Sequence, residues 1–392
     1  MPHYQAQGLL PQKRFTTVKR PGGGIYYEHI ISAEGFDAEE SIIYRLAMPT
    51  RILRKRVEVI RRNFPDVLTG NALFHVASVP ESGDYFSARK EMLFSDDLIF
   101  SIAKPTASMA NFYRNAVADE LVTVIEGAGV MRSVFGEIAY GPLDIICIPR
   151  GHTIQWLTDG SPQILAITES RSSLRVPAKF LKPNGQYRDD APFHERDIRA
   201  PQLVDPIEED GELEILIKGI DTVTNAIVQH HPFDAVGWDG GYYPWALNLA
   251  NYEPKAGRVH LLPDQFMAFQ TPETMISFIT PRRLADHPES TPLQPYHQNA
   301  HFDEILYRFS GSTGETEPGG GTFTLHPQGF DHGPKPGFEG SPPRSYQEAW
   351  GLMVDTRAHL RVTLTAQEHM DESYDQMYLT GSELKLLNSV TG

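Results

Sequence analysis

The sequence predicts a mostly β protein built from antiparallel sandwich or barrel modules. The chain has 32 glycines and 30 prolines among 392 residues, and helix-breaking residues at that density favour short strands joined by turns. Apolar segments bounded by Gly, Pro, Asp or Asn also recur along the chain. These predicted strands are 121–125, 145–149, 163–168, 214–217, 246–249, 275–280, 304–309, 321–325 and 359–364.

Only two segments have the pattern of a helix, 37–45 and 50–62, and the second follows Pro49 and ends in basic residues. Two helices are too few to cover a parallel sheet, so we expect antiparallel sheets. The stretch 176–235 carries clusters of proline and charge and is interpreted as a connection. It would join an N-terminal module, 1–175, to a C-terminal module, 236–392.

Length and charge narrow the class of protein. A chain of 392 residues exceeds the roughly 150 residues of an ordinary domain. The net charge of −15 makes nucleic acid and anionic membranes poor partners. No apolar run approaches the roughly 18 residues of a membrane span, and no secretory signal pattern opens the chain. The single cysteine, Cys147, excludes an internal disulfide, so we expect a cytoplasmic protein.

A short block of sequence occurs twice. Residues 115–120 and 299–304 share Asn, Ala, Asp and Glu at matching offsets, and a glycine follows the Glu at the same distance in both. A second pair of blocks, 148–154 and 326–332, shares Pro-x-Gly. The repeat predicts two related β modules that arose by duplication.

The two copies differ in the residues that could carry chemistry. His297 aligns with Tyr113 and His332 with Ile154, so only the second copy offers two imidazoles with the carboxylate of Glu304. Antiparallel pairing could bring these three side chains to one inward face. Two histidines and one carboxylate suit non-haem Fe(II) that binds both substrate and O₂, and zinc with a bound water is the alternative. The N-terminal module is expected to lack metal ligands.

The repeated blocks resemble the paired motifs of the cupin superfamily, and the chain resembles a bicupin. Segments 236–244, 296–299, 325–334 and 353–356 are similar to the homogentisate 1,2-dioxygenase family. The resemblance implies a ring-cleaving dioxygenase that opens homogentisate or a related hydroquinone and places both atoms of O₂ in the product. It also implies a homo-oligomer, either a trimer or a hexamer built from trimers.

By the same resemblance, one Fe(II) would be bound in the C-terminal module by His297, Glu304 and His332. His326 falls where the family keeps a second histidine near the metal. His326 or Asp239 could accept the proton of the substrate hydroxyl. The alternatives are that His326 orients a ligand and that Asp239 is only a turn residue.

Three departures from the commoner family pattern weaken the substrate assignment. Asp239 stands where that pattern has a histidine, Gln298 where it has an arginine, and one extra residue separates His297 from Glu304. Without the arginine, a partner for a substrate carboxylate is missing, so a hydroquinone with another substituent is an alternative.

An aromatic substrate would need contacts beside the metal. Tyr243, Tyr296 and Gln298 are the predicted substrate-binding residues. Two other functions remain open: an O₂-independent metal-dependent isomerase or hydrolase using zinc or manganese, and a non-catalytic binding or storage protein. The three ligands argue against the last.

Overall fold

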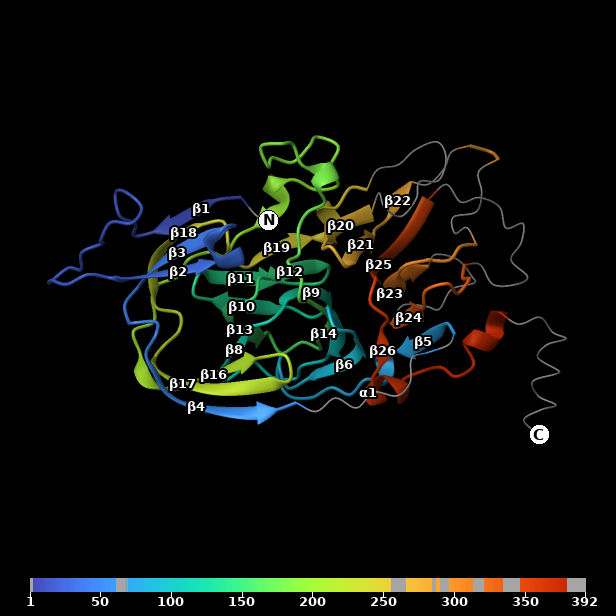
Figure 1. Cartoon of the computed structure of the whole chain (residues 1–392), viewed down its shortest axis with the longest axis horizontal. Helices are drawn as coiled ribbons and strands as arrows, with labels where there is room; N and C mark the ends of the chain where they lie inside the picture. Colours follow the sequence, from blue (N-terminus) through green and yellow to red (C-terminus); the bar gives the residue numbers. More distant parts are fainter. Residues whose placement is uncertain are drawn as a thin grey trace.

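The computed structural model describes residues 3–60, 68, 70–254, 266–283, 287–289, 296–312, 321–333 and 346–378. Strands dominate this part of the chain and form four sheets, which confirms the predicted fold class (Figure 1). Among the described ladders, only that between β8 (Phe112–Asn115) and β16 (Asp210–Lys218) is parallel. The helical elements are α1 (Leu364–Gln367) and 3₁₀ turns at Glu34–Phe36, Val76–Ser78, Ala178–Phe180, Glu195–Asp197, Leu249–Asn251 and Asp375–Tyr378.

Two sheets face each other in the middle of the molecule. The eight-stranded sheet has the order β15 (Ile198–Arg199), β19 (Trp245–Asn248), β12 (Asp144–Ile148), β9 (Asp119–Glu126), β14 (Ile164–Ser170), β7 (Leu98–Ala103), β6 (Arg89–Phe94) and β26 (Arg361–Val362). The seven-stranded sheet has the order β11 (Gly136–Tyr140), β10 (Gly129–Ser133), β13 (Thr153–Thr158), β8, β16, β17 (Thr222–His230) and β4 (Ile52–Val59). Buried side chains of both sheets, including Trp156, Met131, Val122 and Ile167, form one core between them.

The other two sheets lie at opposite ends of the long axis (Figure 1). One has the order β1 (Gln5–Gly8), β18 (Ala235–Gly240), β3 (Glu40–Arg45) and β2 (Tyr27–Ser32). The other has the order β20 (Met267–Gln270), β21 (Thr274–Ile279), β25 (Tyr346–Thr356), β23 (Asp303–Ser312), β24 (Thr322–His326) and β5 (Ala72–His75), with β22 (Arg282–Arg283) paired to β25. This last sheet carries the repeated blocks of the second half.

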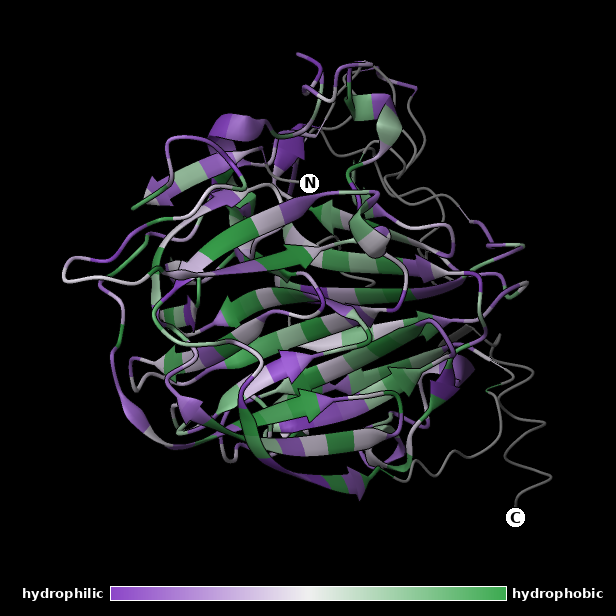
Figure 2. Cartoon of the chain, turned by 60° about the vertical axis from the view of Figure 1, so that its left-hand side comes forward, coloured by the Kyte–Doolittle hydropathy of each residue, from purple (hydrophilic) through white to green (hydrophobic). Residues whose placement is uncertain are grey.

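The two halves of the chain exchange edge strands. β5, from the first half, pairs with β24, and β26, from the second half, pairs with β6. A single apolar cluster links the halves, and in it Phe74 stacks on Phe323 with ring centroids 4.6 Å apart. Apolar and polar residues alternate along many strands, as Figure 2 shows, because successive side chains point to opposite faces.

The structure corrects three sequence predictions. Segment 37–45 is not a helix, because its last six residues form β3, in which Ile42 and Ile43 are buried between β2 and β18. The described part of 50–62 is likewise a strand, β4, held by pairing with β17, and the rest lies outside the described residues. Tertiary pairing overrides local helix propensity in both segments. In 359–364 only Arg361–Val362 form a strand, and Leu364 begins α1. The other eight predicted strands overlap observed ones.

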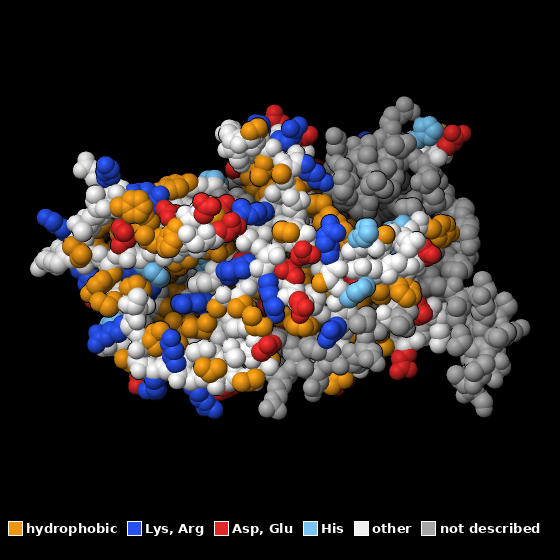
Figure 3. Space-filling view, in the orientation of Figure 1, with side chains coloured by type: hydrophobic (Ala, Val, Ile, Leu, Met, Phe, Trp, Pro, Cys, Tyr) orange, Lys and Arg blue, Asp and Glu red, His pale blue; other side chains and the backbone are white. Residues whose placement is uncertain are grey.

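The stretch predicted as a connection, 176–235, contains the long hairpin β16–β17 within the seven-stranded sheet. Side chains of both charge signs are interspersed over the described part of the face in Figure 3. The helices that the structure describes include none that is long and apolar enough to cross a membrane.

Candidate metal centre

Strand pairing brings the repeated blocks of the second half together. Glu304, on β23, lies opposite His326 of β24 on one side and Asp355 of β25 on the other. Ahead of β23, His297 forms an isolated bridge with His332, and each backbone N–H donates to the other residue's carbonyl at 3.0 and 2.9 Å. The later block therefore returns beside the first, as the sequence predicts.

The three predicted ligands lie close enough to share one ion. One potential ligand atom from each of His297, Glu304 and His332 lies within 4.8 Å of the others. Nε2 of His332 is 3.7 Å from Oε2 of Glu304, and the rings of the two histidines have centroids 4.2 Å apart. Glu304 and His332 are buried, and His297 is half-buried. The arrangement is that of a two-histidine, one-carboxylate metal site.

The electrostatics of the site favour a cation. Burial alone would raise the pKa of Glu304, but contact with His332 and the other nearby imidazoles lowers this pKa to about 2. Burial lowers the pKa of His332, and the adjacent Glu304 carboxylate more than offsets that effect, so the net shift is upward. A buried carboxylate that stays charged attracts a positive ion into the space between the imidazoles.

The His332 side chain has the geometry of a metal ligand. Its Nδ1 lies 3.1 Å from the carbonyl oxygen of Phe330, which suits an N–H donor at that position. Its Nε2 is buried without a hydrogen-bond partner in the described structure, and the 3.7 Å to Glu304 is too long for a hydrogen bond. A buried nitrogen lone pair needs a partner, and a metal ion supplies one. The residues present therefore fit Fe(II) or zinc.

His326 lies against the site with both ring nitrogens engaged. It stacks on His332 with centroids 4.2 Å apart and planes 12° apart. Its Nε2 is 2.9 Å from Oγ1 of Thr324, and its Nδ1 is 3.1 Å from Oδ1 of Asn71. Burial lowers the pKa of His326 to about 3, so the ring is neutral. These contacts favour a positioning role for His326.

Two neighbours of Glu304 had no role in the sequence-based prediction. The carboxylate of Asp355 is buried beside Glu304, and burial followed by the charge of Glu304 raises its pKa well above the usual range. The Asn299 amide donates to Glu304 at 3.2 Å and to Asp355 at 3.4 Å. Asn299 belongs to the repeated block, and its recurrence as Asn115 in the first copy is the sequence feature that could have indicated its role. Asp355 lies in segment 353–356, which resembles the family, but only the strand register places it beside Glu304.

The remaining predicted site residues divide into two groups. Tyr296 and Gln298 flank His297 and are exposed, so they lie next to the metal ligands. Tyr243 is fully buried among core rings, and its hydroxyl donates to the carbonyl oxygen of His3 at 2.7 Å. Asp239, on β18, forms an ion pair with Arg14 at 3.1 Å. β18 lies at the other end of the molecule from β23 in Figure 1, so the chain does not bring Asp239 to its own three ligands.

Comparisons with known proteins indicate the family to which the chain belongs. A family model described as homogentisate 1,2-dioxygenase N-terminal matches residues 90–249. A protein of Saccharolobus solfataricus, provisionally named a dioxygenase, is 31% identical over 388 residues, which cover 97% of this chain and 100% of that protein. The chain belongs to the homogentisate 1,2-dioxygenase family. The resemblance carried by the sequence motifs is thereby confirmed.

More distant members of the homogentisate 1,2-dioxygenase family match over part of their length. The enzymes named homogentisate 1,2-dioxygenase in Rhodopseudomonas palustris and Sinorhizobium medicae are 28% and 26% identical to this chain. Each match covers 66% of this chain and 60% of the relative. Among solved structures, YlbA of E. coli and a cupin 2 conserved barrel protein of Leptotrichia buccalis each show 8% identity and a TM-score of 0.35. The match to YlbA covers 77% of this chain and 95% of YlbA, and the match to the Leptotrichia protein covers 76% of this chain and 100% of that protein.

Proposed function

We propose that this protein is a non-haem Fe(II) dioxygenase that opens the ring of homogentisate or a related substituted hydroquinone. Both atoms of O₂ would enter the product. The observation that carries the proposal is the buried Nε2 of His332, which faces Glu304 and has no hydrogen-bond partner among the residues that the structure describes. Membership in the homogentisate 1,2-dioxygenase family supports the choice of iron and of an aromatic substrate.

The residues around the site would have different roles in binding the metal and in orienting its ligands. His297, Glu304 and His332 would hold Fe(II), and the iron would supply the means to activate O₂ and to carry electrons to it from the ring of the substrate. Glu304 keeps its negative charge because the imidazoles lower its pKa. The Phe330 carbonyl fixes the His332 ring from one side, and His326 stacks on its face. The ligands are thus oriented before the substrate arrives.

Substrate recognition would fall to the exposed residues beside the first ligand. The Tyr296 ring can pack on an aromatic substrate, and the Gln298 amide can hydrogen-bond a ring substituent. An amide does not replace the charge of an arginine, so the proposal includes hydroquinones whose substituent is not a carboxylate. Of the two proposed proton acceptors, His326 lies against the site of its own chain. Asp239 could act only at the site of a neighbouring chain in the expected homo-oligomer, because β18 lies at the other end of the molecule from β23.

Oxygen uptake tests the proposal. The protein would be loaded anaerobically with Fe(II) and mixed with homogentisate and a series of substituted hydroquinones, and O₂ consumption and product mass would be followed. We expect one or more of these compounds to consume O₂ and gain two oxygen atoms from ¹⁸O₂. Absence of O₂ uptake with every compound would overturn the proposal. Turnover without O₂, in the zinc or manganese form, would favour the isomerase or hydrolase alternative.

A further inference from the structure

The first module repeats the hydrogen-bonded frame of the metal centre. The backbone pairing of His297 with His332 recurs there, as do the contacts of the Asn and the Asp that the two blocks share. Tyr113 pairs with Ile154 in the first module as His297 pairs with His332 in the second. The backbone N–H of Gly151 donates to the Asn115 carbonyl, as that of Gly329 donates to the Asn299 carbonyl. The Asp119 carboxylate accepts from the backbone N–H groups of Arg150 and Leu174, as the Asp303 carboxylate accepts from those of Gln328 and Leu360. Glu120 of the first module therefore occupies the place of Glu304.

A pair of buried carboxylates is part of this shared frame. Glu120 lies opposite Glu169 of β14, and the Asn115 amide donates to Glu120 at 3.0 Å and to Glu169 at 2.8 Å. In the second module the same three places are held by Glu304, Asp355 and Asn299. Each module thus buries two carboxyl groups side by side, an arrangement that is costly unless positive charge lies nearby.

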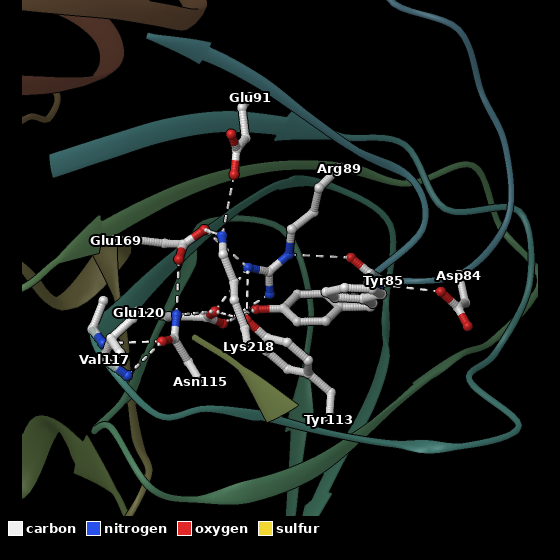
Figure 4. A network of polar contacts seen from close by, with 12 residues as sticks. Asp84, Tyr85, Arg89, Glu91, Tyr113, Asn115, Val117, Glu120, Glu169 and Lys218 are labelled. Atoms are coloured by element: carbon white, nitrogen blue, oxygen red, sulfur yellow. Dashed lines mark hydrogen bonds and ion pairs between the residues drawn. The ribbon is translucent and has the colours of Figure 1, made fainter. Parts of the chain in front are cut away.

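The first module supplies that positive charge from its own side chains, as Figure 4 shows. Arg89 donates two parallel hydrogen bonds to Glu120, at 2.7 and 2.8 Å, and a third to Glu169 at 3.2 Å. The Lys218 ammonium lies 2.6 Å from Glu169. All four side chains are at most 5% exposed. Two cations therefore face the carboxylate pair in a nearly closed space, and Lys218 also contacts the partly exposed carboxylate of Glu91 at 3.3 Å.

Aromatic residues complete the enclosure of the Arg89 guanidinium. Tyr85 and Tyr113 donate their hydroxyls to Glu120 at 2.7 and 2.5 Å. The guanidinium carbon lies 4.3 and 4.8 Å from their ring centroids, within the range of a cation–π contact. Tyr113 holds the position of the ligand His297, so the residue that would bind a metal in the second module instead helps to hold a guanidinium in the first.

We propose that Arg89, assisted by Lys218, is a built-in replacement for the divalent cation of the second module. The fixed guanidinium balances the carboxylate pair, keeps the first module from binding metal and limits the chain to one metal ion. Removal of its charge would uncover a latent cation site. The donors left there would be the carboxylate oxygens of Glu120 and Glu169 and the phenol oxygens of Tyr85 and Tyr113, a set that suits Mn²⁺ or another oxygen-preferring ion. The proposal does not depend on the reaction catalysed at the second module.

The test begins from the His297→Ala/His332→Ala chain, in which the second site is disabled. In this background Arg89→Met should gain about one bound Mn²⁺ per chain, counted by electron paramagnetic resonance, and Mn²⁺ should raise its Tm. The parent double variant should show neither effect. Arg45→Met is the matched control, because it breaks an ion pair of 2.6 Å to a single carboxylate, Asp234. If Arg89→Met binds no more Mn²⁺ than the control, the proposal is overturned.

A second variant covers the case in which Arg89→Met does not fold. Arg89→Met/Glu120→Gln removes one charge of each sign and leaves Lys218 opposite Glu169. We expect this pair of substitutions to recover folding, with a Tm above that of Arg89→Met alone and without Mn²⁺ binding. If the double substitution is no more stable than Arg89→Met alone, the proposal that Arg89 balances the charge of Glu120 and Glu169 is contradicted.

Discussion

The His326 ring stacks on the His332 ring with centroids 4.2 Å apart, while its two nitrogens contact Thr324 and Asn71. Asn71 directly precedes β5, the strand from the first half of the chain that pairs with β24. The orientation of His332, a proposed metal ligand, therefore depends through His326 on a residue of the first half. This relationship leads to the first prediction.

His326→Asn should weaken metal binding while the chain remains folded. Loss of the stacked ring frees His332 to rotate, and removal of such supporting contacts typically lowers metal affinity by about 10–100-fold. The measurement is the Fe(II) or Zn²⁺ dissociation constant, with the pH profile of kcat as a second readout. Unchanged metal affinity combined with a lower kcat and an altered pH profile would instead support the proton-accepting role predicted from the sequence.

Substitution of either ligand histidine should empty the metal site. His297→Ala and His332→Ala each remove one of three ligands, and we expect the purified variants to hold less than about a tenth of the wild-type iron. His301→Ala is the matched control, because His301 is exposed and lies between the ligands in sequence without belonging to the cluster. Full iron content in either ligand variant would refute the assignment, and so would loss of iron in the control.

Substitutions at the predicted substrate-binding residues should affect KM where the side chain is exposed beside His297, and stability where it is buried. Gln298→Ala and Tyr296→Ala should raise KM by about tenfold and leave iron content unchanged, because both side chains are exposed beside His297. Tyr243→Phe should leave KM unchanged and lower stability by about 1 kcal/mol, because it removes the buried hydrogen bond to His3. A large increase in KM for Tyr243→Phe would show that this residue reaches a substrate, as the sequence predicted.

Phe323→Ala should destabilise both halves of the molecule together. Phe323 is fully buried, stacks on Phe74 and makes edge contacts with Phe100 and Tyr307. Truncation of a buried Phe typically costs about 3–5 kcal/mol. Chemical denaturation monitored by fluorescence and by circular dichroism should show one transition at a lower midpoint. Two separate transitions in the wild-type protein would contradict a shared core.

Acid should remove part of the stability of the first module. The pKa of Glu120 is about 2, because Arg89 and the hydrogen-bond donors around it outweigh the effect of burial. A folded-state pKa below the ordinary 4.5 stabilises the protein above pH 4.5, and this stabilisation is lost as the pH falls toward 2. Glu120→Gln should therefore be less stable than wild type at pH 7, and the difference should shrink between pH 4.5 and 2. A difference that stays constant with pH would argue against a charged Glu120.

Local sequence patterns were sufficient for most strands and for the clustering of the three predicted ligands. His297, Glu304 and His332 lie in two short blocks, and their spacing together with antiparallel pairing predicts that they meet. The strands of both modules were found because their apolar residues are bounded by turn residues. In these cases the information lies within a few residues of the chain.

Features that depend on distant partners were missed. β4 has the basic residues and the preceding proline of a helix, and only its pairing with β17 makes it a strand. Asn71 contacts His326, and Arg89 contacts Glu120, from strands or loops far away in sequence. Asp355 lies beside Glu304 because of the register of β25. None of these relationships has a local signal, since each is set by how the sheets assemble.

Anomalous diffraction at the iron edge, on crystals loaded with Fe(II) under anaerobic conditions, tests the account most directly. We expect one iron peak per chain, at bonding distance of about 2.0–2.2 Å from His297, Glu304 and His332, and none beside Glu120. A peak bound by other residues would contradict the metal centre, and a second peak between Glu120 and Glu169 would contradict the replacement of metal by Arg89.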